Sequence, residues 1–155
     1  MAQEENIKKE LSGKFSNLED SIIIKRERRI FLDVAWEKFS EVFDYLVKDM
    51  RFNVLSAITG LDEGAGIAVI YHLTKDGGLM FNLRTRISKE APAINSVTSY
   101  FSYAEIYERE LVDLLGIKVS GLAEGPHYPL ADNWPKNEFP LRKDWKGKIE
   151  ESKNA

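Results

Sequence analysis

The sequence predicts a single α+β domain, with helices packed on a mixed or antiparallel sheet, followed by a long irregular C-terminal tail. Three observations lead to this prediction. Residues 34–50 have the apolar spacing of an amphipathic helix, and residues 53–87 contain three consecutive β-like runs. Residues 117–145 hold four of the five prolines and show little periodicity. We therefore expect a core domain over residues 1–116 and an extended tail over residues 117–155.

Before the long helix, the sequence predicts one short helix and two strands. Residues 4–14 form a polar helix with a thin apolar stripe: Ile7, Leu11 and Phe15. Runs of Ile, Phe and Leu over residues 21–25 and 28–33 are typical of strands. The basic stretch between them, residues 25–29, is interpreted as a solvated turn or strand edge, with a surface for an acidic partner as the alternative.

The helix over residues 34–50 is the clearest feature of the sequence. Its apolar residues share one helical face: Trp36, Phe39, Val42, Phe43, Leu46, Val47 and Met50. A helix that lies on a sheet needs this spacing, so core packing is favoured over a ligand pocket lined by the aromatic residues. Asp33 stands where an N-cap belongs.

Three strands are expected next, over residues 53–59, 67–74 and 79–87. Apolar and polar residues alternate in the last of them, which is typical of a half-buried strand. The sequence between the last two strands, KDGG at residues 75–78, has the composition of a hairpin turn. His72 lies inside an apolar run, and we interpret it as a half-buried histidine with satisfied hydrogen bonds.

The second half of the chain predicts a second long helix. Residues 91–101 are interpreted as a loop and a short helix that carries Ile94, Val97 and Tyr100. Residues 103–115 are predicted to be helical, and Gly116 is placed to end that helix. The buried side of this helix is expected to comprise Tyr107, Leu111, Leu114 and Leu115. The tail that follows contains tryptophans, which favour packing over disorder.

Composition excludes several classes of protein. The chain has 155 residues and a net charge of −3 at pH 7, which argues against nonspecific nucleic-acid binding. It has no cysteine, so disulfides, thiolate zinc sites and iron–sulfur clusters held by its own thiolates are excluded. The polar N-terminus predicts no cleaved secretory signal, and no apolar window is long enough to predict a membrane span.

The densest charge cluster lies on the helix over residues 103–115 and comprises Glu105, Glu108, Arg109, Glu110 and Asp113. Arg109 can pair with Glu105 and Asp113 at i±4, so a solvated, self-paired face is the favoured interpretation. Paired carboxylates can serve acid–base catalysis, but nothing nearby in the sequence supplies a nucleophile or a metal. The glycines at residues 64–66 do not complete a dinucleotide fingerprint. No catalytic, cofactor-binding or metal-binding residue is predicted, and the chain looks more like a binding module than an enzyme.

Two other functions stay open at this point. A free-standing enzyme could use the carboxylates of residues 108–113 or His127, and stoichiometric metal in the purified chain would favour it. A small nucleic-acid-binding domain could use Arg84, Arg86 and residues 25–29, and a salt-dependent mobility shift would favour it.

Residues 108–117, ERELVDLLGI, resemble the ERExxDxxGI signature of the thirty-kilodalton (C) subunit family of respiratory complex I. Residues 140–145, PLRKDW, resemble the PLRKD motif that closes the domain in that family. Two shorter segments are also similar to the family: YHL at residues 71–73 and NSVT at residues 95–98. The order and spacing agree from residue 4 to residue 146, so the resemblance covers nearly the whole chain.

Two departures favour one branch of the family. Ile106 stands where respiratory members carry Trp, and residues 121–135 replace their His-Pro-x-Leu stretch. This variant resembles the counterpart in energy-converting, membrane-bound [NiFe] hydrogenases and related complexes. It favours a ferredoxin- or hydrogen-linked complex over the alternative, the C subunit of a quinone-reducing NADH dehydrogenase.

The resemblance implies a non-catalytic subunit in the cytoplasmic arm of a membrane-bound redox complex, peripheral to the membrane. Its tail would dock on the large subunit, close to the iron–sulfur small subunit, and membrane ion-translocating subunits would complete the complex. The nickel–iron and iron–sulfur centres would lie in those partners and not in this chain. The residues expected to dock are Glu108, Arg109, Glu110, Asp113, Trp134, Phe139, Pro140, Leu141, Arg142, Lys143, Asp144 and Trp145.

Three of these expectations are more specific. Arg109 and its carboxylates are expected to orient the signature helix or to pair across a subunit boundary. Arg142 offers a planar fork of donors for a partner carboxylate. The expected aromatic anchors are Trp134, Phe139 and Trp145.

Overall fold

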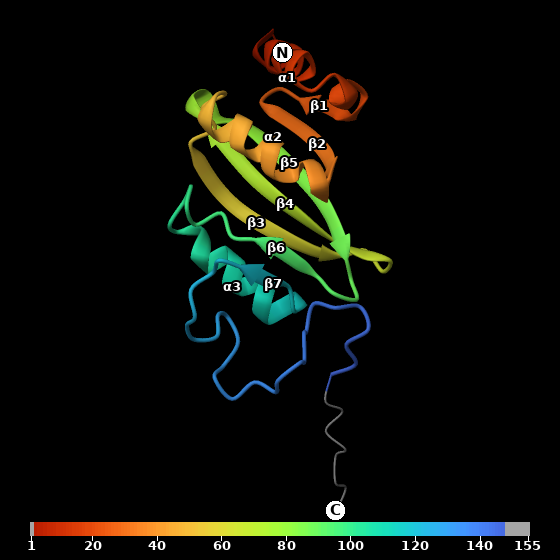
Figure 1. Cartoon of the computed structure of the whole chain (residues 1–155), viewed down its shortest axis with the longest axis vertical. Coiled ribbons are helices and arrows are strands. Elements are labelled where there is room, and N and C mark those ends of the chain that lie inside the picture. The colour runs from red at the N-terminus through yellow and green to blue at the C-terminus, as the bar shows by residue number, and fades with distance from the viewer. Residues whose placement is uncertain (1, 148–155) are drawn as a thin grey trace, which may run out of the picture.

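The computed structural model describes residues 2–147, and its central element is a five-stranded sheet (Figure 1). The strand order is β1-β2-β5-β4-β3, made of β1 (Ile22–Arg26), β2 (Arg29–Ala35), β3 (Val54–Asp62), β4 (Gly66–Lys75) and β5 (Leu79–Ser88). Neighbouring strands are antiparallel except β2 and β5, which run parallel. The α+β class with a mixed sheet, predicted from the sequence, is confirmed.

Helix α2 (Trp36–Lys48) lies across one face of the sheet and forms the centre of the core (Figure 1). The predicted apolar stripe is buried where it meets the sheet, at Phe39, Val42, Phe43 and Leu46. The ring of Tyr71 on β4 is fully buried between these side chains, 4.7 Å from the ring of Phe39 and 5.5 Å from that of Phe43. The aromatic residues of α2 therefore pack the core, as their spacing predicted.

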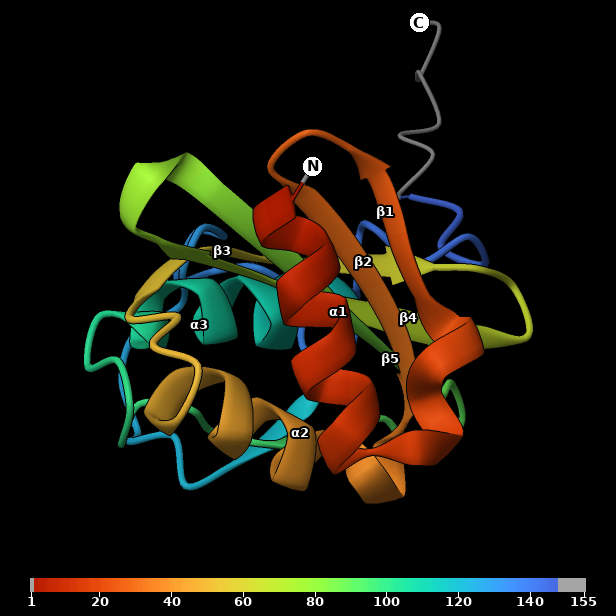
Figure 2. The same cartoon turned by 90° about the horizontal axis from the view of Figure 1, so that it is seen from above.

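Helix α1 (Ala2–Lys14) and the 3₁₀ helix η1 (Ser16–Ser21) close one end of the domain (Figure 2). The predicted stripe of Ile7, Leu11 and Phe15 is buried, and the Phe15 ring meets the Tyr45 ring of α2 edge-on at 5.6 Å. The basic stretch that begins at Lys25 forms the end of β1 and its turn into β2. The turn or strand-edge interpretation is therefore confirmed.

The hairpin between β4 and β5 and the environment of His72 are as predicted. The 3₁₀ turn η2 (Asp76–Gly78) joins the two antiparallel strands. The Nδ1 atom of His72 lies 2.6 Å from Oδ1 of Asn82, and its Nε2 atom lies 2.9 Å from Oγ1 of Thr59. Both ring nitrogens therefore have a hydrogen-bond partner.

Two local predictions were wrong. Asp33 is not an N-cap, because β2 stays paired with β5 as far as Ala35, and α2 begins only at Trp36. Asp33 instead pairs with Arg86 on β5. Residues 91–101 form strand β6 (Ala93–Asn95) and turns in place of a short helix, and Ile94 is buried from that strand.

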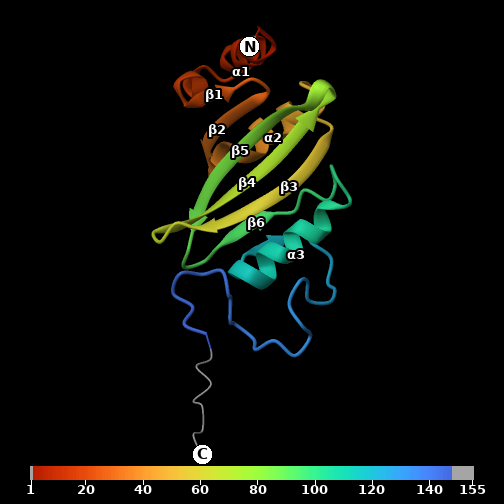
Figure 3. The ribbon, with the colours of Figure 1, turned by 180° about the vertical axis from the view of Figure 1, so that it is seen from behind.

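The second long helix, α3 (Ala104–Leu115), lies beside β3 (Figure 3). The short strand β7 (Lys118–Ser120) follows it (Figure 1). Gly60 on β3 allows this close approach, since a Cβ there would collide with Leu111 and Leu115. Strand β7 pairs in parallel with β6, so the first residues after 116 join a small second sheet. From there to residue 147 the chain has turns and bends but no helix or strand.

Candidate functional site: the signature helix and the tail

The end of α3 is built to receive the tail. Gly116 has the left-handed φ of 69°, and its N–H donates to the Val112 carbonyl at 3.0 Å. The Phe139 ring occupies the space that a Cβ at this position would need. Glycine is therefore required here twice, once for the backbone turn and once for the contact with the tail, and the helix end predicted at this residue is confirmed.

Two residues of the PLRKDW segment cap α3. The N–H of Leu141 donates to the Leu114 carbonyl at 3.0 Å, and Nε of Arg142 donates to the Leu115 carbonyl at 2.7 Å. The Arg142 guanidinium also lies over the Phe139 ring, 5.0 Å from its centroid. The last carbonyls of a helix have no intrahelical donor and carry partial negative charge. The Leu141 N–H and the Arg142 guanidinium therefore stabilise the end of α3 and, by the same bonds, hold this part of the tail against the domain.

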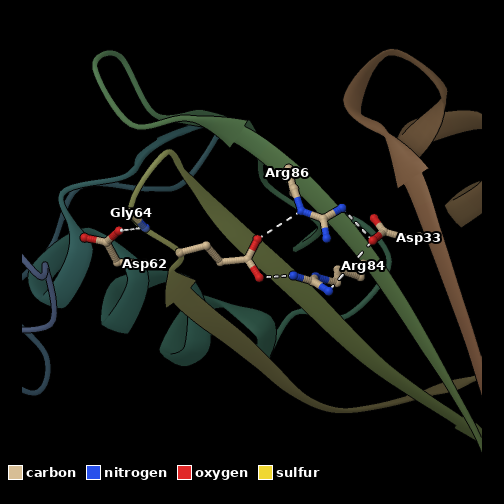
Figure 4. A network of polar contacts seen from close by, with 6 residues as sticks. Asp33, Asp62, Gly64, Arg84 and Arg86 are labelled. Carbon is tan, nitrogen blue, oxygen red and sulfur yellow. Dashed lines mark hydrogen bonds and ion pairs between the residues drawn. The ribbon is translucent and has the colours of Figure 1, made fainter.

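A second contact holds the next two tail residues to the end of β3. The buried carboxylate of Asp62 accepts from the N–H of Lys143 at 2.8 Å and pairs with Nζ of Lys89 at 2.7 Å. Lys89 also pairs with Asp144 at 3.2 Å, and the N–H of Gly64 donates to the other oxygen of Asp62 at 2.8 Å (Figure 4). The bond from Lys89, followed by the two backbone N–H groups, holds the pKa of Asp62 well below its usual range. Phe139, Leu141, Arg142, Lys143 and Asp144 are called the tail anchor below.

Glu108 does not lie on a solvated face of α3, contrary to the interpretation of the charge cluster. Its side chain is fully buried, and its carboxylate accepts from the N–H of Val97 at 2.6 Å and from Oγ of Ser96 at 2.8 Å. Burial raises the pKa of Glu108, while these two hydrogen bonds act in the opposite direction. Within the chain, Glu108 fixes the loop before α3.

Arg109 and Asp113 bind the first part of the tail, from separate positions on α3. Arg109 makes the predicted pair with Glu105, at 3.0 Å from Nε and 2.7 Å from Nη2, and its Nη2 also donates to the Ala123 carbonyl at 2.9 Å. The predicted pair between Arg109 and Asp113 is wrong. Asp113 instead lies 2.9 Å from Nδ1 of His127 and accepts from the N–H of Leu130.

These contacts surround a cavity of about 540 Å³ between α3, β7 and residues 122–127. Arg109, Asp113 and His127 line it, but each already has a partner within the chain. No group of three or more His, Asp or Glu side chains in residues 2–147 is placed to hold a metal ion. Arg109, Asp113 and His127 are thus engaged in contacts within the chain, whereas the exposed residues Lys118 and Glu124 also line the cavity.

The outer side of the tail presents large apolar side chains to solvent. Leu141 is 55% exposed, Tyr128 44% and Trp145 36%. The Trp134 and Trp145 rings lie 6.1 Å apart, and Nε1 of Trp134 donates to the Glu138 carbonyl at 2.8 Å. Among the other residues expected to dock, Glu110, Trp134, Phe139 and Pro140 are half-buried, whereas Lys143 and Asp144 are exposed. Their docking on a partner stays a prediction.

Three residues of this site were not singled out from the sequence: Asp62, Lys89 and Ser96. Asp62 and Lys89 meet the tail across long sequence separations, and no spacing rule reports such a contact. Ser96 belongs to the NSVT segment, so the resemblance marked its position but not its bond to Glu108.

Comparison with known proteins gives one consistent family. The sequence profile described as "Respiratory-chain NADH dehydrogenase, 30 Kd subunit" matches residues 32–151. The C subunit of the F420H2 dehydrogenase of Methanosarcina mazei is 32% identical over 140 residues, which covers 88% of each chain. Formate hydrogenlyase subunit 5 of Escherichia coli is 30% identical over 131 residues, covering 75% of this chain and 23% of that protein.

The solved structures agree with the sequence comparisons. A chain in the structure of the membrane-bound sulfane sulfur reductase, described as an archaeal respiratory membrane complex, superposes with a TM-score of 0.78. The sequence identity is 25%, and the match covers 91% of this chain and 84% of that one. No helix in residues 2–147 has the length and apolar character needed to cross a membrane.

Proposed function

The chain belongs to the family of the 30-kDa subunit of respiratory-chain NADH dehydrogenase, a family found in membrane-bound respiratory complexes, and on this premise we propose that it is a non-catalytic structural subunit of a complex of the energy-converting [NiFe] hydrogenase type. It lies in the peripheral arm on the cytoplasmic side of the membrane. It buttresses the large subunit next to the iron–sulfur small subunit. These partners hold the nickel–iron and iron–sulfur centres, and membrane subunits of the same complex translocate ions.

The two-sided tail is the observation that supports this role most strongly. Its inner side is fixed to the domain by the tail anchor, in which Arg142 caps α3 and Lys143 binds Asp62. Leu141 and Trp145 of the tail are exposed, next in sequence to the exposed charged residues Lys143, Asp144 and Lys146. Exposed large apolar side chains rimmed by polar groups are typical of protein–protein interfaces. The tail therefore has the form of an arm that the domain holds in place and that a partner covers.

The hydrogenase type is supported by the likeness to a formate hydrogenlyase subunit. It also fits the resemblance of residues 121–135 to the counterpart in energy-converting hydrogenases and related complexes. The likeness to the sulfane sulfur reductase supports membership of a respiratory membrane complex. The family description itself supports the alternative, a C subunit of a quinone-reducing NADH dehydrogenase. Both alternatives give this chain the same structural role and differ in the partners.

The test is affinity purification of the tagged full chain from its native membranes in mild detergent, with mass spectrometry of the proteins recovered. Recovery of a nickel–iron large subunit, an iron–sulfur small subunit and antiporter-like membrane subunits is the expected result. Recovery of a quinone-type large subunit with NADH-oxidising partners would keep the structural role and replace the hydrogenase type. Recovery of the chain alone would contradict the proposal.

A matched pair of variants tests the tail in the same experiment. Leu141→Asp places a charge on the exposed face of the tail and should lower recovery of the large subunit by about tenfold. Val54→Asp changes a side chain of similar exposure on β3, 46% against 55%, and should leave recovery unchanged. Equal recovery with both variants would mean that the exposed side of the tail does not contact the large subunit.

A further inference from the structure

The face of the sheet opposite α2 is not covered by a helix in the described part of the chain (Figure 3). The cations at its two ends differ in their ion pairs. Arg84, Arg86 and Asp33 lie towards one end, where β2 and β5 approach the β3–β4 turn. The basic stretch around β1 and the start of β2 lies at the other end. Both ends carry clustered cations, so they can be compared directly.

At the first end, the cations are neutralised within the chain. Arg86 pairs with Asp33 at 2.6 Å and with Glu63 at 2.9 Å, and Arg84 pairs with Glu63 and, at 3.8 Å, with Asp33 (Figure 4). Two arginines and two carboxylates thus form a closed network on this face. This end of the sheet needs no further anion.

At the second end, Arg28 pairs with Glu27 at 3.9 Å, but three other cations have no carboxylate partner in residues 2–147. Lys25, Arg26 and Arg29 line a groove of about 430 Å³. None of these three side chains forms an ion pair with a residue in 2–147. Within the described residues, the Arg29 side chain donates to two backbone carbonyls, that of Arg28 at 2.7 Å and that of Gly78 at 3.3 Å, which hold its guanidinium at the edge of the groove. The groove therefore brings three unpaired cationic side chains together on a chain whose net charge is −3.

The floor of the groove combines apolar side chains with polar groups that are already hydrogen-bonded. Phe31 and Met80 line it and are half-buried, and Ile23, which pairs with Phe31 in register, is 47% exposed on the neighbouring strand. Asn82, the register partner of Phe31 on β5, also lines the groove, and its side chain is already bonded to His72 and to the Ile30 carbonyl. The polar groups of the floor are thus satisfied, so what the groove offers a partner is apolar surface with a basic rim.

We propose that this basic groove is a second interface of the chain, which takes an acidic and partly apolar segment of a neighbouring protein subunit. The inference rests on the proposed function, since it needs the chain to be part of a complex. Charge complementarity identifies the occupant: carboxylates of the segment would supply the partners that Glu63 and Asp33 supply at the other end of the same face. The side chain between those carboxylates would contact Phe31 and Met80, and the planar forks of Arg26 and Arg29 suit carboxylate oxygens.

Carbodiimide cross-linking of the complex, purified in mild detergent through the tagged full chain, tests this inference. The reagent joins a lysine amine to a carboxylate where the two are in contact. The expected product, found by mass spectrometry, joins Lys25 to an Asp or Glu of another subunit. Lys25→Arg keeps the charge and removes the amine, so it should abolish this product while the same subunits are still recovered.

Charge reversal on the rim of the groove is a second test, and the same charge reversal on α1 is its matched control. Arg26→Glu with Arg29→Glu should lower the yield of the Lys25 product about tenfold, as expected for the loss of two exposed ion pairs. Lys9→Glu with Lys14→Glu makes the same change in charge on α1, away from the groove, and should leave the yield unchanged. Equal losses with both double variants would show a general charge effect and overturn the inference.

Three other outcomes would also overturn it, and they are distinguishable from one another. In the intact complex, acetylation of Lys25 as fast as that of Lys9, with no cross-link, would show that the groove is open to solvent while the proposed function stands. Salt-dependent binding of the chain to phosphatidylglycerol vesicles, lost in the Arg26→Glu, Arg29→Glu variant, would replace the protein segment with a lipid surface. Recovery of the chain without other subunits would remove the proposed function and this inference together.

Discussion

The α+β domain and the tail are held in place by different forces. The domain has a continuous apolar core in which residues such as Phe43 and Tyr71 are 1% exposed or less. The tail over residues 121–147 has no regular secondary structure and is fixed by a small number of polar bonds to α3 and β3. Burial of one large apolar side chain contributes about as much free energy as two or three such hydrogen bonds. We therefore expect the domain to resist unfolding more strongly than the tail resists local opening.

The largest effect is expected in the core. Phe43→Ala removes a ring that packs 5.4 Å from Phe39 and 5.3 Å from Tyr100, and it should cost about 3–5 kcal/mol of the free energy of unfolding. Urea denaturation followed by circular dichroism measures this loss. Ile106→Ala, at a site 49% exposed, is the control and should change stability by less than about 0.5 kcal/mol. A small loss with Phe43→Ala would contradict the division between core and tail.

The second effect lies where α3 meets the loop before it. Glu108→Ala leaves the buried N–H of Val97 without an acceptor and should cost about 1–3 kcal/mol, whereas Glu108→Gln keeps an acceptor for that N–H and should cost less. Both are measured by urea denaturation. Equal losses for the two variants would show that the hydrogen bond to Val97 is not what stabilises this site.

The pH dependence of the same residue sharpens the test. Because burial raises the pKa of Glu108, its contribution to stability is complete below its unfolded pKa of about 4.3 and is lost as pH rises through the raised folded value. The Glu108→Gln variant should therefore gain stability relative to the unmodified chain as pH rises from about 4 to about 8. A difference that is independent of pH would contradict the raised pKa.

The third effect should be confined to the tail. Arg142→Ala removes the cap on the Leu115 carbonyl and should lower the free energy of local opening of the tail by about 1–2 kcal/mol, while the domain unfolds at an unchanged midpoint. Hydrogen exchange of the amides of residues 139–145 measures the local opening. Arg142→Lys keeps the charge but not the planar fork and should give an intermediate result. A fall in the global midpoint as large as that of Phe43→Ala would mean that the tail is part of the cooperative core.

The smallest effect is expected from the contact between Asp62 and the tail. Because the pKa of Asp62 is lowered, its carboxylate stabilises the contact with the tail above its unfolded pKa of about 3.9, and this stabilisation is lost as pH falls through the folded pKa. The pKa of Lys89 is raised, chiefly by its bond to Asp62. The Lys89 ammonium therefore stabilises the same contact below about pH 10.4, and this stabilisation is lost as pH rises through the folded pKa of Lys89. Protection of the Lys143 amide should therefore be greatest between these limits. Asp62→Asn should flatten this profile, and an unchanged profile would contradict the assigned contact.

The domain was more predictable from the sequence than the tail, for a physical reason. The helix α2 and the hairpin of β4 and β5 depend on local patterns, namely apolar spacing and turn composition, and both were predicted. The N-cap assigned to Asp33 failed because pairing of β2 with β5 extended the strand past it. Strand β6 was missed because a three-residue strand has no period long enough to detect.

The site was predicted only in outline. The signature helix and its end at Gly116 followed from spacing, and the resemblance marked the PLRKDW segment. The burial of Glu108 was not predictable from residue type, because a carboxylate is buried only when distant groups, here Ser96 and Val97, donate to it. The contacts of Arg142 with Leu115 and of Lys143 with Asp62 span 27 and 81 residues of sequence, beyond the reach of any local pattern.

Hydrogen–deuterium exchange on the full chain, alone and within the purified complex, tests the central claim most directly. Amides of the core strands β4 and β5 should exchange equally slowly in both samples, because the core is complete without partners. Amides of residues 121–147 should exchange faster than the core amides in the isolated chain and become more protected in the complex, because a partner covers the outer side of the tail. Equal exchange of these tail amides in the two samples would contradict the claim that the tail is the docking arm of this subunit.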